Sequence, residues 1–317
     1  MTSHMPVTRR DLLKLGAGAA ATAALAARPA AATEGRFDLT GSSSPLIWKK
    51  DLYDQTVLQS FAFDNVHGHI YTLQLRNGTG QNAAGNLCLT KLSLTGTVLG
   101  HMYLMGFGHG VQLGVEPSGS SAYLWTETDG VTENGSARGS QLARFRFADG
   151  QTLDTSSPAL TKYKPIASAD NTTCAIDPSR NRLIMRYRSE GAFRFAVYSL
   201  PALKAGTVSA LFDIAQPAGL GVFQGYAAFG NFLYLLTGEA YSDANPAPGN
   251  THITCLDLRT GGQVQRELTE AGKSLDYREP EGMAIQIAAG LPRLCLGLAS
   301  GVEKARKASI FYKSAMV

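Results

Sequence analysis

The sequence has few cysteines, few charges and no long apolar segment after its first 32 residues. Its four cysteines form no C-x-x-C pair and have no pair of histidines beside them, which excludes the common zinc-site patterns. Only 17% of the 317 residues are charged, and the net charge of +4 comes from Lys and Arg that are scattered rather than clustered. This composition argues against a nucleic-acid partner, and we expect no membrane span once the N-terminal segment is removed.

Helical periodicity and compact catalytic motifs are also missing. From Pro45 onward, short apolar stretches alternate with turns rich in Gly, Asn, Ser and Pro, which indicates an all-β protein. There is no G-x-S-x-G, no Gly-rich phosphate loop and no H-E-x-x-H. A site assembled from separate strands would leave no such motif, so catalysis stays open.

The N-terminal segment has the features of an export signal. Arg9 and Arg10 precede Leu12, Leu13 and an alanine-rich apolar run, and small residues at 30–32 offer a cleavage site. This pattern resembles the bacterial twin-arginine signal and predicts a secreted protein; a retained membrane anchor is the alternative. We expect a signal peptide at 1–32, a linker at 33–44 and a single domain at 45–317.

The stretch GHGVQLGVEPSGSSAYLWTETD (108–129) has a layout that occurs four more times. It contains a short apolar strand, a turn and a second strand. The small residues in the middle of the first strands are Ala62, Gly114, Ala175, Ala228 and Ala284, at spacings of 52, 61, 53 and 56 residues. Repeated strand pairs at such a period predict a five-bladed β-propeller, with a β-sandwich as the alternative.

Third and fourth strands follow most of these hairpins, but the last repeat has no fourth strand. Residues 46–52 form an unassigned strand near the start of the sequence. We expect this strand to complete the last blade and to close the ring. Cys88 and Cys255 then occupy matching positions in separate blades, too far apart to pair, and we expect buried free thiols.

In a propeller, the starts of the first strands and the ends of the second strands meet at one rim, where polar residues accumulate. We expect the binding site at the central mouth of that rim. The candidate catalytic residues are His109, Tyr187, Arg188 and Glu281. The candidate ligand-binding residues are Gln59, Arg76, Glu127, Asn171, Arg186, Gln224, Tyr226, Glu239 and Glu279.

These residue types suggest specific roles. His109 lies between two glycines and is a candidate acid or base, or else a structural histidine. Arg186 and Arg188 suit carboxylate or phosphate groups of a polymer, or else ion pairs between blades. Glu279 and Glu281 suit acid/base chemistry; calcium is an alternative, although one motif cannot supply the six or more oxygens that it takes.

The segments QSFAFDN (59–65), 108–129 and EPEGMAI (279–285) resemble a five-bladed propeller family. This family includes teichoic acid biosynthesis protein C, helveticin J-like bacteriocins and receptor-binding proteins of staphylococcal phages. The resemblance covers residues 46–317 and implies action outside the cell on wall polymers such as teichoic acid. It also implies that His109, Glu116, Glu127 and Glu281 are shared features.

Two classes of function remain open. The first is a secreted, monomeric module that binds a wall polymer or extracellular polysaccharide at the mouth, with tyrosines such as Tyr187 and Tyr226 stacked on sugar rings. The second is an enzyme that cleaves such a polymer. It could be a lyase on uronic-acid sugars with His109 or a tyrosine as the base, or a hydrolase with Glu281 as one of two carboxylates.

Overall fold

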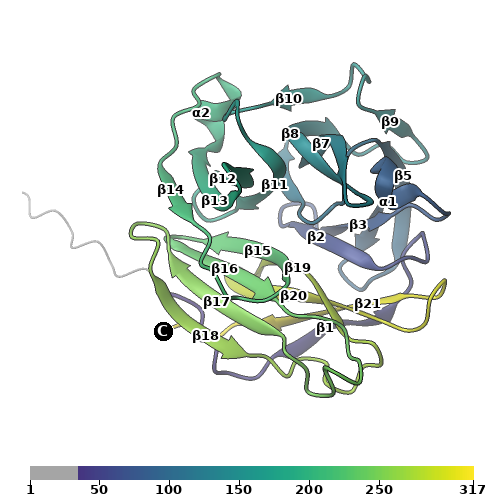
Figure 1. The fold of residues 1–317 in the computed structure, drawn as a ribbon, viewed down its shortest axis with the longest axis vertical. Helices are drawn as coiled ribbons and strands as arrows, with labels where there is room; N and C mark the ends of the chain where they lie inside the picture. The colour runs from purple at the N-terminus through teal and green to yellow at the C-terminus, as the bar shows by residue number, and fades with distance from the viewer. Residues whose placement is uncertain (1–34) are drawn as a thin grey trace, which may run out of the picture. The chain divides into compact units, whose positions relative to one another are not determined.

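The computed structural model describes residues 35–317, which form the five-bladed β-propeller that the sequence predicts. Five sheets surround a central axis (Figure 1), and the first strands of neighbouring blades contact one another there. The proposed signal peptide at 1–32 lies outside the described residues. No helix within 35–317 is long and apolar enough to cross a bilayer.

The strands follow the chain from blade to blade. Blade one contains β2 (Leu58–Asp64), β3 (His69–Leu75), β4 (Leu87–Ser93), β5 (Val98–Met105) and the added β9 (Thr152–Asp154). Blade two contains β6 (Gly114–Ser118), β7 (Ser121–Glu133), β8 (Ser136–Arg146) and β10 (Thr161–Tyr163). Blade three contains β11 (Asp170–Asp177), β12 (Arg182–Ser189), β13 (Ala192–Ser199) and β14 (Phe212–Ala215).

The last two blades follow the same plan. Blade four contains β15 (Phe223–Phe229), β16 (Phe232–Thr237), β17 (His252–Asp257) and β18 (Gln263–Leu268). Blade five contains β19 (Glu279–Ala288), β20 (Leu291–Ser300), β21 (Lys307–Lys313) and β1 (Ser44–Lys50). Two short helices, α1 (Gln81–Ala84) and α2 (Leu200–Lys204), lie in connecting segments.

The N-terminal strand closes the ring, as predicted. β1 pairs antiparallel with β21, with Ile47 opposite Ile310, so the fourth position of blade five is filled from the other end of the domain. The described part of the expected linker is instead part of the fold. Phe37 and Leu39 are fully buried, because their apolar side chains fill the space between blades four and five.

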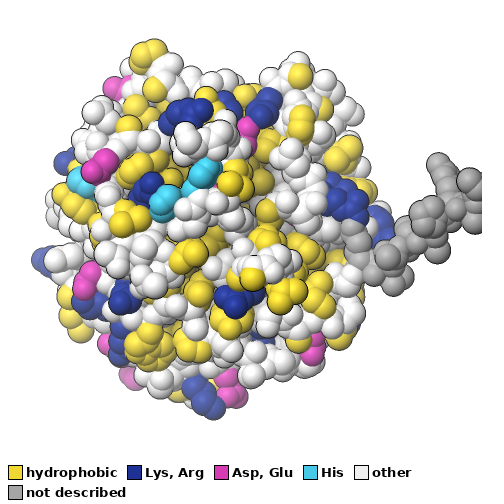
Figure 2. Space-filling view, turned by 180° about the vertical axis from the view of Figure 1, so that it is seen from behind, with side chains coloured by type: hydrophobic (Ala, Val, Ile, Leu, Met, Phe, Trp, Pro, Cys, Tyr) yellow, Lys and Arg dark blue, Asp and Glu magenta, His cyan; other side chains and the backbone are white. Residues whose placement is uncertain are grey.

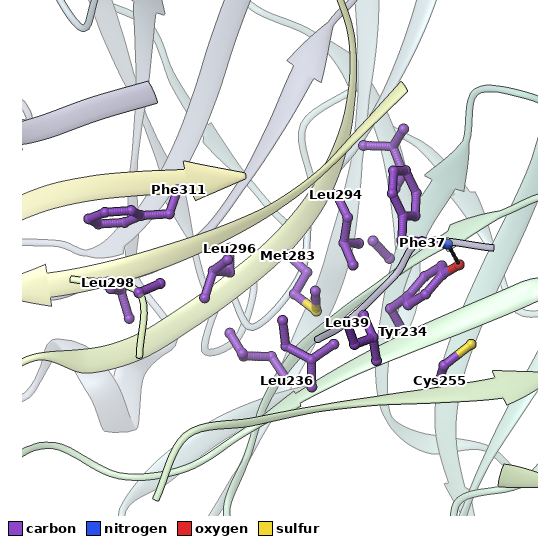
Figure 3. Packing of buried hydrophobic residues seen from close by; sticks show 14 of the residues in the cluster. Phe37, Leu39, Tyr234, Leu236, Cys255, Met283, Leu294, Leu296, Leu298 and Phe311 are labelled. Carbon is purple, nitrogen blue, oxygen red and sulfur yellow. Dashed lines mark hydrogen bonds between the residues drawn. The ribbon is translucent and has the colours of Figure 1, made fainter. Parts of the chain in front are cut away.

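Figure 3 shows how this N-terminal segment joins the core. The Phe37 backbone N–H donates a hydrogen bond to the Tyr234 hydroxyl at 2.9 Å, and the two rings meet edge to face. Met283 and Leu294 from blade five pack in the same cluster. The four cysteines are buried and free, which confirms the expectation from the repeat.

Small residues and one glutamine fill the propeller axis. A Cβ atom on Gly114 would lie 3.0 Å from the Ile176 side chain, which explains why the middle of the first strands carries small residues. The buried Gln112 side chain donates to the Met283 carbonyl at 3.0 Å and accepts from the Tyr226 N–H at 3.2 Å. Gln112 therefore ties blades two, four and five together at the axis.

The strands of blade two have other bounds than expected. β6 starts at Gly114 rather than at residue 111, and β7 continues to Glu133 instead of ending near residue 126. Glu127 and Asp129 therefore lie within a strand rather than at its end.

On the face shown in Figure 2, Lys and Arg side chains are interspersed with Asp and Glu rather than gathered in one basic stripe.

Candidate functional site

A cavity of about 740 Å³ opens at the rim where the first strands begin. This volume lies in the range of small-ligand pockets in proteins. Of the predicted site residues, the following line it: Gln59, His109, Gln224, Glu279 and Glu281. A cavity therefore lies at the rim where the sequence predicts a polar central mouth.

Local irregularities at the starts of the first strands aim these side chains. The pairing register shifts between Leu58 and Ser60 in β2, between Phe223 and Gly225 in β15, and between Pro280 and Met283 in β19. These shifts contain Gln59, Gln224 and Glu281, respectively. An extra residue in one strand bends that strand and re-aims its side chain, so the irregularities turn three polar groups toward the cavity.

Glu127 holds His109 in place from behind the cavity wall. Its buried carboxylate accepts the backbone N–H groups of His109 at 3.2 Å and Gly110 at 2.7 Å, and that of Gly139 at 2.6 Å. A Cβ atom on Gly108 would lie 2.2 Å from this carboxylate, so only glycine fits there. Glu127 is therefore a positioning residue and not a ligand-binding residue, which corrects the expectation from the sequence.

The side chain of His109 is oriented by its contact with α1. Its Nδ1 atom lies 2.8 Å from Asn82 Oδ1 and 3.0 Å from Ser136 Oγ; since the Ser136 hydroxyl donates to the same Asn82 oxygen, both neighbours of Nδ1 are acceptors and Nδ1 carries the proton. Nε2 has no hydrogen-bond partner among residues 35–317 and is left as an acceptor at the cavity. Burial and the charge of Arg138 lower the pKa of His109 to about 3. A base with so low a pKa removes carbon-bound protons poorly near neutral pH.

Glu281 is the most unusual group in the cavity. Its side chain is 4% exposed and its carboxyl has no hydrogen-bond partner in the described part of the chain. Burial, and secondarily the neighbouring Glu279, raise the pKa of Glu281 well above its usual value. The neutral acid is therefore favoured, and it can donate a hydrogen bond to a ligand.

Replacing Glu281 with glutamine is expected to stabilise the protein increasingly as the pH rises. A carboxyl whose pKa is raised by folding contributes stability below its unfolded pKa of about 4.5, and this contribution is lost as the pH rises toward the folded pKa. Glutamine does not titrate. Thermal melting from about pH 4 to about pH 7.5 checks this; Glu303→Gln, at an exposed cavity position, is the control. A difference in Tm that does not change with pH would contradict the expectation.

Basic residues that the sequence reasoning missed complete the cavity. Arg138, Lys304 and Arg306 line it, and the Arg138 guanidinium has no hydrogen-bond or ion-pair partner within residues 35–317. Arg306 instead lies with its guanidinium carbon 3.4 Å from the Tyr277 ring centroid. Lys304 and Arg306 come from the segment that joins β20 to β21, and Arg138 comes from the start of β8, just after the turn that follows the second strand β7. Such segments meet at the same rim, because neighbouring strands are antiparallel, and this was the signal that could have found them.

Four predicted residues of blades three and four do not line the cavity. Tyr187 is buried and its hydroxyl donates to Asp213 Oδ2 at 2.8 Å. Arg188 pairs with Asp170 and with Glu133 of the blade-two hairpin, so the alternative of ion pairs between blades is correct for it.

Arg186 and Tyr226 are also structural. The Arg186 guanidinium carbon lies 3.6 and 3.9 Å from the ring centroids of Phe193 and Phe223, and burial lowers the pKa of this arginine to about 9. The fully buried Tyr226 hydroxyl donates to the Ile184 carbonyl at 3.1 Å. Arg186 and Tyr226 therefore support the wall of the cavity from behind.

The remaining predicted residues lie elsewhere at this rim or at the other one. Arg76 lies over the Tyr103 ring of blade one, Glu239 accepts from the Asn250 side chain, and Asn171 occupies a left-handed backbone position in β11. Glu116 is bound by Arg144 and by the Trp125 indole N–H in blade two. Within residues 35–317, no group of three or more His, Cys, Asp or Glu side chains is arranged to hold a metal ion.

Comparison with known proteins identifies relatives of the whole domain. Residues 57–312 match the family model described as the phage 5-bladed beta propeller receptor binding platform domain. The chain is 30% identical over 287 residues to the putative major teichoic acid biosynthesis protein C of Bacillus subtilis strain 168, which covers 87% of this chain. The chain spans only 63% of that relative's length.

Solved structures share the fold. The tail fiber of Staphylococcus aureus phage P68 superposes with a TM-score of 0.71 at 20% identity, covering 88% of this chain and 54% of the tail fiber chain. An exo-β-1,3-galactanase from Phanerochaete chrysosporium reaches a TM-score of 0.51 at 10% identity, over 84% of this chain and 64% of the enzyme. At these identities the likeness is one of architecture. The matches together show that the chain belongs to the family of phage five-bladed β-propeller receptor-binding platform domains.

Proposed function

We propose that the protein binds an anionic cell-surface glycan of the teichoic acid type in the cavity at the rim. The observation that carries this proposal is the convergence of groups without protein partners. Arg138, Glu281 and the Nε2 atom of His109 line one cavity, yet none of the three has a hydrogen-bond partner within the described residues. Glu281 is buried, and a buried polar group normally has a partner, so its carboxyl is available to a ligand; Arg138 and His109 are half-buried and present their free groups to the same cavity.

The three groups are complementary to a polymer that carries both negative charge and hydroxyl groups. The guanidinium of Arg138 suits a phosphate or carboxylate oxygen. The Nε2 atom of His109 accepts a hydrogen bond from a hydroxyl, and the neutral Glu281 donates one to an oxygen of the ligand. With Glu281 neutral, the remaining charged residues of the cavity sum to a net positive charge; they are Arg138, Lys304, Arg306, Glu279 and Glu303.

The family supports a role in cell-surface recognition. The match to a receptor-binding propeller and the similarity to a protein named for teichoic acid biosynthesis both favour a wall polymer as the ligand. This role requires the protein to be outside the cytoplasm, in line with the twin-arginine pattern around Arg9 and Arg10.

Substitution of Arg138 with glutamine is expected to weaken polymer binding about ten- to a hundredfold, since a hydrogen-bonded charge pair contributes roughly 1.5–3 kcal/mol. Isothermal titration calorimetry with glucosylated poly(glycerol phosphate) measures this, with the uncharged polymer dextran as a second ligand. Arg188→Gln is the matched control, because Arg188 is at the same rim but is held in ion pairs away from the cavity. The proposal would be overturned if the two variants weakened binding equally, or if the wild-type protein bound the two polymers with the same affinity.

A hydrolase is the second candidate, and one observation favours it. Glu281 combines a raised pKa with a nearby carboxylate, Glu279, and such a pair can serve as general acid and second carboxylate in glycoside cleavage. Such cleavage frees a sugar with a new reducing end. Release of reducing sugar from the polymer by the wild-type protein, and its loss in Glu281→Gln, would support this activity. The lowered pKa of His109 disfavours the lyase alternative.

A further inference from the structure

We propose that a second subsite for the same polymer lies on blade one, at a surface formed by Tyr53, Arg76, His101 and Tyr103, here called the Tyr53 patch. This inference rests on the proposed function and extends it from a single cavity to a bound polymer chain. The ligand group that the patch would take is a sugar ring that carries, or lies next to, an anionic group.

The Tyr53 patch is an organised aromatic surface. The rings of Tyr53 and His101 are stacked with their centroids 3.3 Å apart and 7° between their planes. Tyr103 meets both rings at steep angles, with centroids 6.5 Å from Tyr53 and 5.4 Å from His101. Tyr53 nevertheless remains 46% exposed. One ring face of Tyr53 is therefore held by His101 while much of the side chain stays open to solvent.

A cation and a polar anchor accompany these rings. The Arg76 guanidinium carbon lies 4.6 Å from the Tyr103 ring centroid, and Arg76 has no ion-pair partner within residues 35–317. The backbone N–H of His101 donates to the Asp149 carboxylate at 2.8 Å, which anchors the strand beneath the ring. Rings already held by their neighbours lose little conformational freedom when a ligand stacks on them.

The patch adjoins the cavity along two short segments of chain. Gln55 and Asn77 line the cavity, and they are two residues from Tyr53 and one residue from Arg76, respectively. The Gln55 N–H donates to the Asn77 side chain at 3.1 Å, and the Asn77 N–H donates to the buried Asp54 at 2.8 Å. Two residues of chain span at most about 7 Å, so one polymer can reach both places.

This arrangement gives the predicted ligand residue Arg76 a role outside the cavity. The C–H faces of a sugar ring pack on an open aromatic face, while an arginine beside it binds a neighbouring phosphate oxygen. Because the two sites would hold one chain, contacts at the patch raise the affinity for a long polymer and add nothing for a fragment that only fills the cavity.

The test compares polymer lengths and sugar content. Tyr53→Ala is expected to weaken binding of long glucosylated poly(glycerol phosphate) about three- to tenfold and to leave the affinity for a fragment of one or two repeats unchanged. The effect should disappear with the same polymer without glucose. Tyr123→Ala is the matched control, because Tyr123 also packs against arginine, Arg144 and Arg146, but lies in the hairpin that turns at the opposite rim.

The outcomes separate this inference from the proposed function. If the wild-type protein binds the long polymer and Arg138→Gln weakens it, but Tyr53→Ala binds like wild type, the second subsite is wrong and the cavity stands. If Tyr53→Ala weakens the fragment as much as the long polymer, Tyr53 acts on the cavity and the second subsite is likewise wrong. If the wild-type protein binds no form of the polymer, the proposed function itself fails. Melting curves of each variant exclude a loss of folding as the cause.

Discussion

Deletion of residues 35–50 from the full chain is expected to unfold the propeller. The deletion removes β1 and leaves β21 without its neighbour in blade five. It also removes the buried side chains of Phe37, Leu39 and Ile47. Loss of one buried phenylalanine alone costs about 3–5 kcal/mol, whereas a whole domain is stable by about 5–15 kcal/mol. Circular dichroism at increasing temperature would show no cooperative transition.

Two point variants measure what the buried side chains of this segment contribute by packing. Phe37→Ala is expected to cost about 3–5 kcal/mol, because it empties the space between blades four and five. Trp48→Ala in β1 is the control: Trp48 is 44% exposed and its main contact is the edge of Phe311, so about 1 kcal/mol is expected. A deletion variant that melts like the intact protein would show that the ring does not depend on closure by β1.

Replacement of Gln112 with leucine is expected to destabilise the protein by about 2–4 kcal/mol. Leucine keeps a side chain of similar size, but it leaves the Met283 carbonyl and the Tyr226 N–H buried without the amide that now pairs with both. Each buried polar group without a partner costs about 1–3 kcal/mol. Denaturant unfolding measures the change in the free energy of unfolding.

The exposed Gln263 in β18 offers the matched substitution for Gln112. Gln263→Leu is expected to change the stability by less than about 0.5 kcal/mol, since its side chain is solvent-exposed. If Gln112→Leu were as stable as Gln263→Leu, the amide would not be holding blades two, four and five together, and the axis would owe its stability to apolar packing alone.

The architecture was predictable because a propeller repeats itself. Each blade buries its faces against its neighbours, so the same spacing of small and apolar residues recurs along the chain. Ala62, Gly114 and Ala284 occupy the axis as that spacing requires, and the strand near residue 47 closes the ring. The length of the β7–β8 hairpin in blade two was not predicted, because these two strands extend beyond the common blade length over residues with no apolar alternation.

The candidate site was predictable only in part. Strand order placed Gln59, His109, Gln224, Glu279 and Glu281 at the mouth, and the structure brings these five to one cavity. The structure instead directs two other predicted residues, Arg186 and Tyr226, into the interior. Arg186 and Tyr226 had the right position along their strands, but both are buried: Arg186 lies against Phe193 and Phe223, and the Tyr226 hydroxyl donates to the Ile184 carbonyl. Sequence spacing does not reveal which of these side chains the neighbouring strands cover.

The sequence by itself determined the number of blades, the closing strand and the rim at which polar residues gather, because these follow from a periodic pattern of apolar and small residues. Only the tertiary structure decided which polar groups are buried, paired or free. Glu127 and Glu281 are both glutamates of this rim, yet Glu127 is satisfied by three backbone N–H groups and Glu281 by none in the described residues. Hydrogen-bond partners and desolvation arise from segments distant in sequence that meet only when the ring closes.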